Sequence, residues 1–179
     1  MATVKQARRN ALIQLLMLIV AVIVIVGAVV VYQNWANNRP GALPEDVSIS
    51  ASNAATGESV EVFPYLSCEP GTDCPEGEVP HLTVGPDDTL VLELPRDVVN
   101  KQWQLLTIYD DPAANDEQLH GPNETDRVEI PGSVDPIEAS TGKRPLLQVV
   151  EVSAVMIGRD ANGEEAPFTT VWSLSTMPT

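Results

Sequence analysis

The sequence predicts an all-β protein: an immunoglobulin-like antiparallel β-sandwich preceded by one N-terminal transmembrane helix. Three observations lead to this prediction. One continuous apolar segment near the N-terminus is long enough for a membrane span. The rest of the chain contains short segments rich in β-branched residues, and Pro, Gly, Asn or Asp closes each of them. No segment after the apolar one has a helical period, so we expect strands there rather than helices.

The predicted membrane span covers residues 11–32, with Gln14 as its single polar interruption. A helix of this length rises about 33 Å, which is enough to cross the hydrocarbon core of a bilayer. Lys5, Arg8 and Arg9 precede the span and no acidic residue does. This asymmetry predicts a cytoplasmic N-terminus and an extracytoplasmic C-terminal domain at the cytoplasmic membrane. A cleaved signal peptide is the alternative, but its apolar region is usually roughly 7–15 residues and ends at a small-x-small site, so we favour an uncleaved signal anchor.

This anchor divides the chain into a cytoplasmic tail (residues 1–10), the transmembrane helix (11–32), a linker rich in Pro, Gly and Asn (33–46) and the extracytoplasmic domain (47–179). The helix can itself bind other membrane helices, because small side chains permit close approach and buried amides hydrogen-bond across helices. A passive anchor is the alternative. The candidate helix contacts are Gln14, Ala21, Gly27 and Ala28.

Eight segments of the external domain have the composition of strands. Several alternate between apolar and polar residues; Leu90, Leu92 and Leu94, for example, share one face. Such alternation places one face on a core and the other in water. Seven or eight short strands in a domain of this length fit two antiparallel sheets packed face to face. The predicted strands are 47–51, 59–64, 81–84, 89–94, 103–109, 127–130, 146–157 and 169–175.

Two details of this sandwich can be predicted more closely. The last two strands flank Asn162-Gly163, a pair that suits a turn with positive φ, so we expect a long hairpin there. Trp103 and Trp172 stand in mid-strand positions with polar neighbours. Large aromatic side chains dominate small cores, so we expect these two indoles at the centre of the sandwich.

The external domain is strongly acidic. All 25 acidic residues of the chain and six of the ten basic ones lie beyond position 44, which gives this part of the chain a net charge of −19. Such a surface repels phosphate backbones and anionic lipid headgroups, so we exclude nucleic acid as a partner. The charge is that of an ordinary solvated surface or, alternatively, of a surface that steers a basic partner.

Cys68 and Cys74 are the only cysteines, and Glu-Pro-Gly-Thr-Asp separates them. Outside the membrane a disulfide persists, and a Pro-Gly turn can bring two such thiols together. We therefore favour a structural disulfide. A metal site would need two further ligands, and His81 and His120 lack suitable spacing. A redox thiol would need a lowered pKa, whereas the neighbouring acids raise it.

Residues 110–126 are predicted to form the longest irregular loop of the domain. This loop is very acidic, so it could contact a partner or gather oxygen ligands for calcium, although it lacks the ligand order of known calcium loops. No nucleophile elbow, phosphate-binding glycine loop or zinc helix occurs in the sequence, so we predict a protein that is not an enzyme and has no cofactor. The candidate interaction residues are Asp110, Asp111, Asp116 and Glu117.

Several framework segments resemble a known family: 64–68 with the second cysteine at position 74, 81–86, 94–98 with Trp103, and 172–174. The chain resembles the actinobacterial family called domain of unknown function 2771, over about residues 46–176. The resemblance implies a small secreted or membrane-anchored protein with a cysteine pair, and it supplies no catalytic residue. Many members look like lipoproteins, but this chain lacks a lipobox cysteine, so lipid anchoring does not transfer.

The chain also resembles, in architecture and size, the accessory subunits of the actinobacterial cytochrome bcc–aa3 supercomplex, which carry no redox centre. The shared architecture is one membrane helix with a cytoplasmic N-terminus, followed by one external β domain. We therefore expect a non-catalytic accessory subunit, held in the bilayer by its helix, with subunits of a membrane complex as partners. The second hypothesis is a cell-envelope module that binds a small molecule, a lipid or a cation. It predicts a pocket beside residues 110–126 or beside the loop between Cys68 and Cys74.

Overall fold

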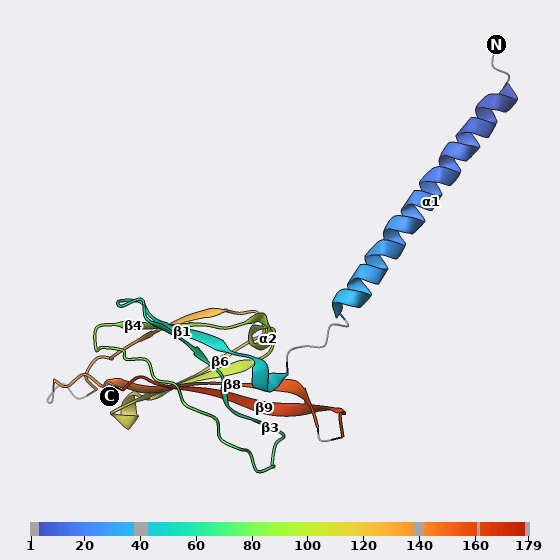
Figure 1. Ribbon diagram of the computed structural model, residues 1–179. Helices are drawn as coiled ribbons and strands as arrows, with labels where there is room; N and C mark the ends of the chain where they lie inside the picture. The colour runs from blue at the N-terminus through green and yellow to red at the C-terminus, as the bar shows by residue number, and fades with distance from the viewer. Residues whose placement is uncertain (1–3, 38–42, 138–141, 161, 178–179) are drawn as a thin grey trace. The chain divides into compact units, whose positions relative to one another are not determined.

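The fold is described from a computed structural model that covers residues 4–37, 43–137, 142–160 and 162–177; in the first of these ranges, side chains are described only for residues 17–33. The chain divides into two compact units, Met1–Gly41 and Ala42–Thr179. The first unit holds helix α1 and the second holds all of the strands (Figure 1).

Helix α1 spans Val4–Asn37 and is thus longer at both ends than the predicted helix at 11–32. The described side chains of α1 are all exposed. In the described part of the chain, no helix combines the length and the apolar character that crossing a membrane requires. The helix predicted from the apolar run is therefore present, while its assignment to a membrane stays a prediction.

The second unit consists of two antiparallel sheets packed face to face, as predicted. The first sheet has the order β2-β1-β4-β7, and the second has the order β3-β9-β8-β5-β6. The strands of the first sheet are β1 (Ile49–Asn53), β2 (Ser59–Val62), β4 (Thr89–Glu93) and β7 (Arg127–Pro131). Those of the second sheet are β3 (Pro64–Cys68), β5 (Trp103–Tyr109), β6 (Asp116–His120), β8 (Leu147–Arg159) and β9 (Glu165–Ser175).

The core lies between the two sheets, and the predicted tryptophans are at its centre. Trp103 and Trp172 are both 0% exposed. The indole N–H of Trp172 donates to the carbonyl oxygen of Val47 at 2.7 Å, so it connects β9 to the segment that leads into β1. Strand β5 alternates strictly between buried and half-buried residues, which is the pattern expected of a strand with one face on a core.

The predicted hairpin near the C-terminus is also confirmed. Strands β8 and β9 pair from Val149↔Ser175 to Arg159↔Glu165. Gly163 closes the turn with φ of +83°, a conformation that glycine adopts without steric cost. The N–H of Gly163 donates to the carbonyl oxygen of Asp160 at 2.9 Å.

Three sequence predictions of the domain's elements are wrong. The predicted strand at 59–64 is two strands, β2 and β3, which lie in different sheets. The segment 81–84 forms a single bridge, His81 with Ser175, instead of a strand. Helix α2 (Arg96–Val99) occurs where no helix was expected, because a four-residue helix is too short to produce a detectable period. Two short 3₁₀ helices, η1 (Pro44–Asp46) and η2 (Pro112–Ala114), complete the domain.

The described part of the domain begins at residue 43, at one end of the sandwich. Element η1 lies there, in contact with β3, β8 and β9. Backbone hydrogen bonds from Asn123 to Val99 and from Leu94 to Asp126 bring α2 and the β6–β7 connection to one end of the sandwich. Figure 1 shows the β8–β9 turn, η1 and α2 at the same end of the domain. We call this the tethered end.

Candidate functional site

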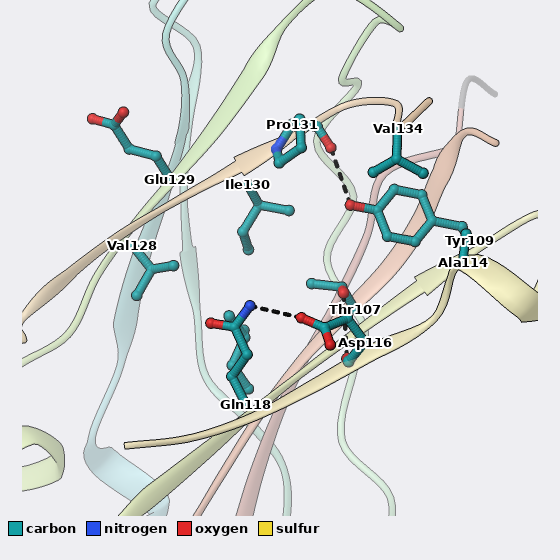
Figure 2. A pocket seen from close by; sticks show the side chains of 11 residues that line it. Thr107, Tyr109, Ala114, Asp116, Gln118, Val128, Glu129, Ile130, Pro131 and Val134 are labelled. Carbon is teal, nitrogen blue, oxygen red and sulfur yellow. Dashed lines mark hydrogen bonds between the residues drawn. The ribbon is translucent and has the colours of Figure 1, made fainter. Parts of the chain in front are cut away.

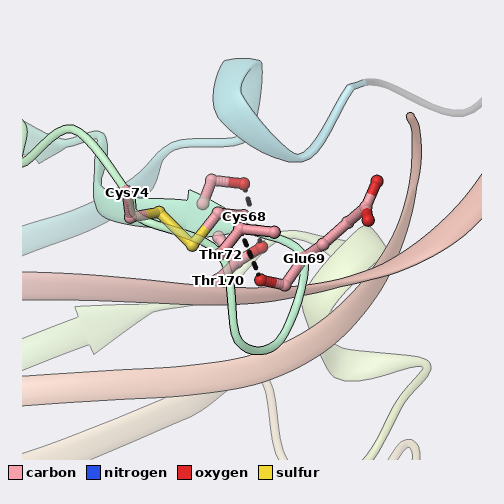
Figure 3. The surroundings of a disulfide bond; sticks show 6 residues. Cys68, Glu69, Thr72, Cys74 and Thr170 are labelled. Atoms are coloured by element: carbon pink, nitrogen blue, oxygen red, sulfur yellow. Dashed lines mark hydrogen bonds between the residues drawn. A yellow bond between two sulfur atoms is a disulfide. The ribbon is translucent and has the colours of Figure 1, made fainter. Parts of the chain in front are cut away.

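The two cysteines form the disulfide that the sequence predicted (Figure 3). It closes a loop at the end of β3, an edge strand of the second sheet. Within this loop the hydroxyl of Thr72 donates to the carbonyl oxygen of Glu69 at 2.8 Å, and Gly71 has φ of +84°. Neither thiol is free. The disulfide therefore holds the shape of one loop and provides no metal ligand.

The predicted acidic loop at 110–126 is wrong as a single irregular loop, because it contains η2 and strand β6. Asp110 accepts hydrogen bonds from Lys143 Nζ at 2.7 Å and from the N–H of Leu146 at 2.8 Å. The hydrogen bond from Lys143 is the main reason why the pKa of Asp110 lies below its ordinary value. Asp111 caps η2 by accepting from the N–H of Ala113 at 3.0 Å.

The other two candidate residues of that segment lie on strand β6 and point in opposite directions. Asp116 pairs with the buried Thr107 and lies on the core side of the sheet, where it is still exposed, whereas Glu117 pairs with Leu106 and faces outward. The four carboxylates are therefore not gathered at one point. In the described residues, no group of three or more His, Cys, Asp or Glu side chains is placed to hold a metal ion.

The predicted helix contacts all lie in α1. The side chain of Gln14 is outside the described side chains, and Ala21, Gly27 and Ala28 are exposed. A Cβ added at Gly27 would meet no atom within 4 Å. These residues remain available for close helix contact, and their role stays a prediction.

The outer face of the first sheet is polar. Ser50, Ser59 and Glu61 are exposed there on β1 and β2. Arg127 Nη1 contacts Glu93 Oε1 at 2.9 Å, and Arg127 Nη2 contacts Glu129 Oε1 at 3.4 Å. This face follows the usual pattern of an antiparallel sheet that has one side in water.

The outer face of the second sheet carries many aliphatic side chains, with polar residues such as Gln104, Glu151 and Ser153 between them. Its outward aliphatic side chains alternate along β5 and β8 with core residues such as Leu105 and Val152, and they continue onto β6 and β9. Three of them are more than half exposed: Leu119 (64%), Val155 (57%) and Ile157 (57%). We call this surface the apolar outer face. Its described aliphatic members are Leu66, Leu106, Ile108, Leu119, Val149, Val155, Ile157 and Val171.

The most exposed part of the apolar outer face lies toward the tethered end. Leu119 and Val155 line one shallow depression of about 150 Å³, together with Gln104, Ser153 and Thr169. Sequence reasoning missed this surface. The run from Val149 to Ile157 is apolar at both odd and even positions, with Glu151 and Ser153 as its polar exceptions. Such a strand is typical of one covered on both faces.

A pocket of about 220 Å³ opens at the side of the sandwich, between edge strands β6 and β7 (Figure 2). Its apolar walls come from both sheets and include Leu105, Val128, Ile130 and Val134. Asp116 and Gln118 stand on the β6 side. The pocket therefore combines an apolar floor with a carboxylate and an amide at its opening.

The wall of this pocket is internally hydrogen-bonded. Gln118 Nε2 donates to Asp116 Oδ2 at 2.7 Å, and Tyr109 Oη donates to the carbonyl oxygen of Pro131 at 3.4 Å. Thr107 Oγ1 donates to the carbonyl oxygen of Asp116 at 3.3 Å. Burial raises the pKa of Tyr109, and the negative charge of Asp116 raises it further. The charge of Asp116 is thus felt inside the pocket.

The histidines lie apart from the pocket. His120 stacks on the buried Trp103 with ring centroids 4.1 Å apart, and its Nδ1 is 3.9 Å from Glu124 Oε1. His81 Nε2 contacts the carbonyl oxygen of Met177. His120 is thus at the tethered end, whereas His81 bridges to Ser175 at the opposite end of β9.

Two antiparallel sheets, a buried tryptophan pair and a disulfide that closes a loop at one edge define a small disulfide-bonded β-sandwich domain. A family model described as "Protein of unknown function (DUF2771)" matches residues 42–177, which is all but the last two residues of the second unit. The chain belongs to the DUF2771 family. No curated protein and no solved structure matches it.

Proposed function

We propose that this protein is a non-catalytic accessory subunit of a larger membrane complex, anchored by its N-terminal helix at the cytoplasmic membrane. In this proposal the domain lies on the extracytoplasmic side, and its apolar outer face packs against another subunit. The specific assignment is the actinobacterial cytochrome bcc–aa3 supercomplex, because the anchor and domain plan resembles its accessory subunits. The observation that carries the proposal is the contrast between the two outer faces of the sandwich.

The apolar outer face supports a protein partner. Isolated exposed aliphatic residues are common on protein surfaces, whereas aliphatic residues that gather on one face of a sheet are typical of an interface. Leu119, Val155 and Ile157 are each more than half exposed, and they lie near the ends of β6 and β8 that point toward the tethered end. Acidic side chains at Glu117 and Glu151 border them, which disfavours contact with anionic lipid headgroups. A protein surface with apolar and basic residues is the matching partner.

The apolar run at 11–32 and the basic residues before it support the membrane anchor. A linker at 33–46 would keep the domain within roughly 50 Å of the bilayer even when fully extended. In that arrangement the apolar outer face meets the extracytoplasmic parts of neighbouring membrane proteins.

The proposal includes an immunoglobulin-like strand order. Strands β1, β4 and β7 correspond to A, B and E, and strands β9, β8, β5 and β6 correspond to G, F, C and C′. Strands β2 and β3 are then an insertion between A and B. In this assignment the apolar outer face is the outer surface of the GFCC′ sheet.

A non-catalytic role is supported by the positions of the titratable groups. The two histidines are at opposite ends of the second sheet, and three acidic residues of the predicted loop, Asp110, Asp111 and Asp116, are engaged with Lys143, with backbone N–H groups or with Gln118. Catalysis by a nucleophile and a base requires the two groups within hydrogen-bond reach of each other. The interaction role therefore fits the described side chains better than an enzymatic one.

The test is affinity purification of the tagged full-length protein from native membranes in a mild detergent, with mass spectrometry and haem absorption of the eluate. We expect haem spectra and cytochrome subunits at near-stoichiometric levels. A matched pair of variants tests the surface: Val155→Thr with Ile157→Thr on the apolar outer face, and Ser59→Thr with Glu61→Thr on the outer face of the first sheet. We expect only the first pair to lose the partner. A colourless protein that purifies alone would contradict the proposal.

A further inference from the structure

The pocket between β6 and β7 has an excess of hydrogen-bond acceptors over donors. Gln118, Thr107 and Tyr109 together carry four side-chain N–H and O–H hydrogens. Three of these hydrogens are given to acceptors in the pocket wall itself: Asp116 Oδ2, the carbonyl oxygen of Asp116 and the carbonyl oxygen of Pro131. One N–H of Gln118 is therefore the only side-chain donor among these three residues that the wall leaves unused.

Acceptors, in contrast, remain. An ionised carboxylate offers about four lone-pair positions, and the described contacts use one oxygen of Asp116. The amide oxygen of Gln118 and the hydroxyl oxygens of Thr107 and Tyr109 also keep lone pairs. No Lys or Arg is among the described residues that line the pocket. The β6 side of the pocket thus carries the negative charge of Asp116 and free acceptors, whereas the other lining carboxylate, Glu129, is paired with Arg127 at 3.4 Å.

The opposite side of the pocket is apolar. Leu105, Val128, Ile130 and Val134 present only aliphatic carbon. The pocket volume of about 220 Å³ corresponds to roughly seven water molecules at their share of liquid volume, so it is large enough for a short aliphatic chain. Such a chain removes apolar surface from water on both partners, which favours binding.

We propose that this pocket binds a primary alkylammonium group, with the aliphatic chain against Val128 and Ile130 and the ammonium group on the carboxylate of Asp116. An ammonium group has three donors and no acceptor, so it complements a wall that has spare acceptors. The positive charge of the ammonium group is also opposite to the negative net charge of the domain, which favours its approach. The ligand is a free small amine, because the pocket opens on the side of the sandwich, away from the apolar outer face.

The experiment is a titration of the full-length chain, with labelled Leu, Val and Ile methyl groups, followed by methyl NMR in a non-ionic detergent. The probe is n-butylammonium, and n-butanol is the neutral probe of the same shape. We expect saturable shifts of the Leu105, Val128, Ile130 and Val134 signals with the amine. We expect n-butanol to bind about tenfold more weakly, because it cannot form the charge-assisted hydrogen bond. Equal binding of both probes, or no saturable shift with the amine, would overturn the proposal.

Two substitutions on β6 provide a matched comparison. Asp116→Asn removes the charge that faces the pocket and is expected to weaken n-butylammonium binding about tenfold. Glu117→Gln removes the same charge one residue away on the outward side and is expected to change it less than about twofold. A third variant, Val128→Phe, fills the pocket and is expected to abolish binding of both probes. If Asp116→Asn keeps wild-type affinity with an unchanged methyl spectrum, the assignment is wrong; if that variant misfolds, the Val128→Phe result and the comparison of the two probes decide.

Discussion

The two outer faces of the sandwich differ in polarity. The first sheet presents serines, glutamates and an arginine, and this arginine, Arg127, pairs with Glu93 and Glu129. The second sheet presents aliphatic side chains, and Leu119, Val155 and Ile157 are largely open to solvent. Both sheets bury their other face in the same core. The comparison of the two outer faces shows that a sheet of this sandwich needs apolar residues only on the side that packs in the core. The fold alone therefore does not explain the apolar residues on the outer face of the second sheet.

The largest expected loss of stability comes from a substitution in the core that the two sheets share. Trp172→Ala empties the centre of the core and breaks the hydrogen bond to Val47, so we expect a loss of about 3–5 kcal/mol in the free energy of unfolding. Urea denaturation of the full chain followed by near-ultraviolet circular dichroism measures this loss. Trp35→Phe, outside the domain, is the control and should leave the midpoint unchanged. If the Trp172 variant kept wild-type stability, the two sheets would not depend on one core.

A smaller effect is expected from the disulfide, which belongs to the second sheet alone. Replacing Cys68 and Cys74 together by Ser removes a short closed loop, which the chain-entropy account values at about 2 kcal/mol. Thermal unfolding of the full chain with and without the double substitution gives the comparison. Reduction of the unmodified protein should lower its melting temperature by the same amount. A loss several times larger would mean that the loop carries part of the core.

The outer faces themselves should contribute little to stability. Arg127→Ala removes two exposed ion pairs from the first sheet, and we expect a loss of less than about 1 kcal/mol. Ile157→Thr exposes no core atom on the second sheet, so it should change stability by about 0.5 kcal/mol or less. Both changes can be measured from urea midpoints at low ionic strength. A loss above about 2 kcal/mol for Ile157→Thr would show that this face stabilises the isolated domain, and would weaken the case for a partner.

The smallest expected effect is a change in how the stability of the domain depends on pH, and it concerns a carboxylate next to the first sheet. The Asp88 carboxylate accepts from Asn53 Nδ2 at 2.9 Å and from the N–H of Gly85 at 2.8 Å. The hydrogen bond from Asn53 is the larger reason why the pKa of Asp88 lies below its ordinary value, and the one from Gly85 adds to it. A carboxyl group with a lowered pKa in the folded state contributes stability above its unfolded pKa and loses it as the pH falls through the folded value. Asp88→Asn should therefore flatten the fall of stability between about pH 5 and about pH 2.

The measurement is a series of urea midpoints across that acid range, for the wild-type chain and for Asp88→Asn. Asp73→Asn serves as the control, because Asp73 is an exposed residue of the disulfide loop for which the described structure gives no hydrogen bond. An Asp88 variant whose acid dependence matches that of the wild type would show that this carboxylate is not coupled to folding.

Sequence reasoning performed well where one strong local pattern decided the structure. The strand at 103–109 was predicted at its observed bounds, because it is rich in aromatic and β-branched residues and Asp110 follows it directly. The turn at Gly163 and the disulfide were also predicted, since each depends on few neighbouring residues. The burial of the two tryptophans followed from their size; Trp172 lies within β9, whereas Trp103 is the first residue of β5.

The failures occurred where the pattern was absent or ambiguous. Strand β6 reads Asp-Glu-Gln-Leu-His and has no apolar alternation, because it is an edge strand with little of its surface buried. The separation of β2 from β3 depends on a change of sheet near Phe63, which local sequence does not record. The pocket is formed by residues from strands distant in sequence, so no single segment could reveal it. The apolar outer face was visible in the run from Val149 to Ile157, and could have been inferred from apolar residues at both odd and even positions.

The hydrogen bond between the Trp172 indole and Val47 has a mechanical consequence. Val47 lies directly after η1, so it is among the first residues of the domain to receive tension that is applied through the N-terminal segment. That tension passes into β1, which has a hydrogen-bonded neighbour on each side, β2 and β4. Pulling the chain therefore requires shearing two ladders at once and withdrawing the indole's acceptor from the core. The N-terminal attachment of the domain is therefore held by two strand pairings and by the hydrogen bond of one buried side chain.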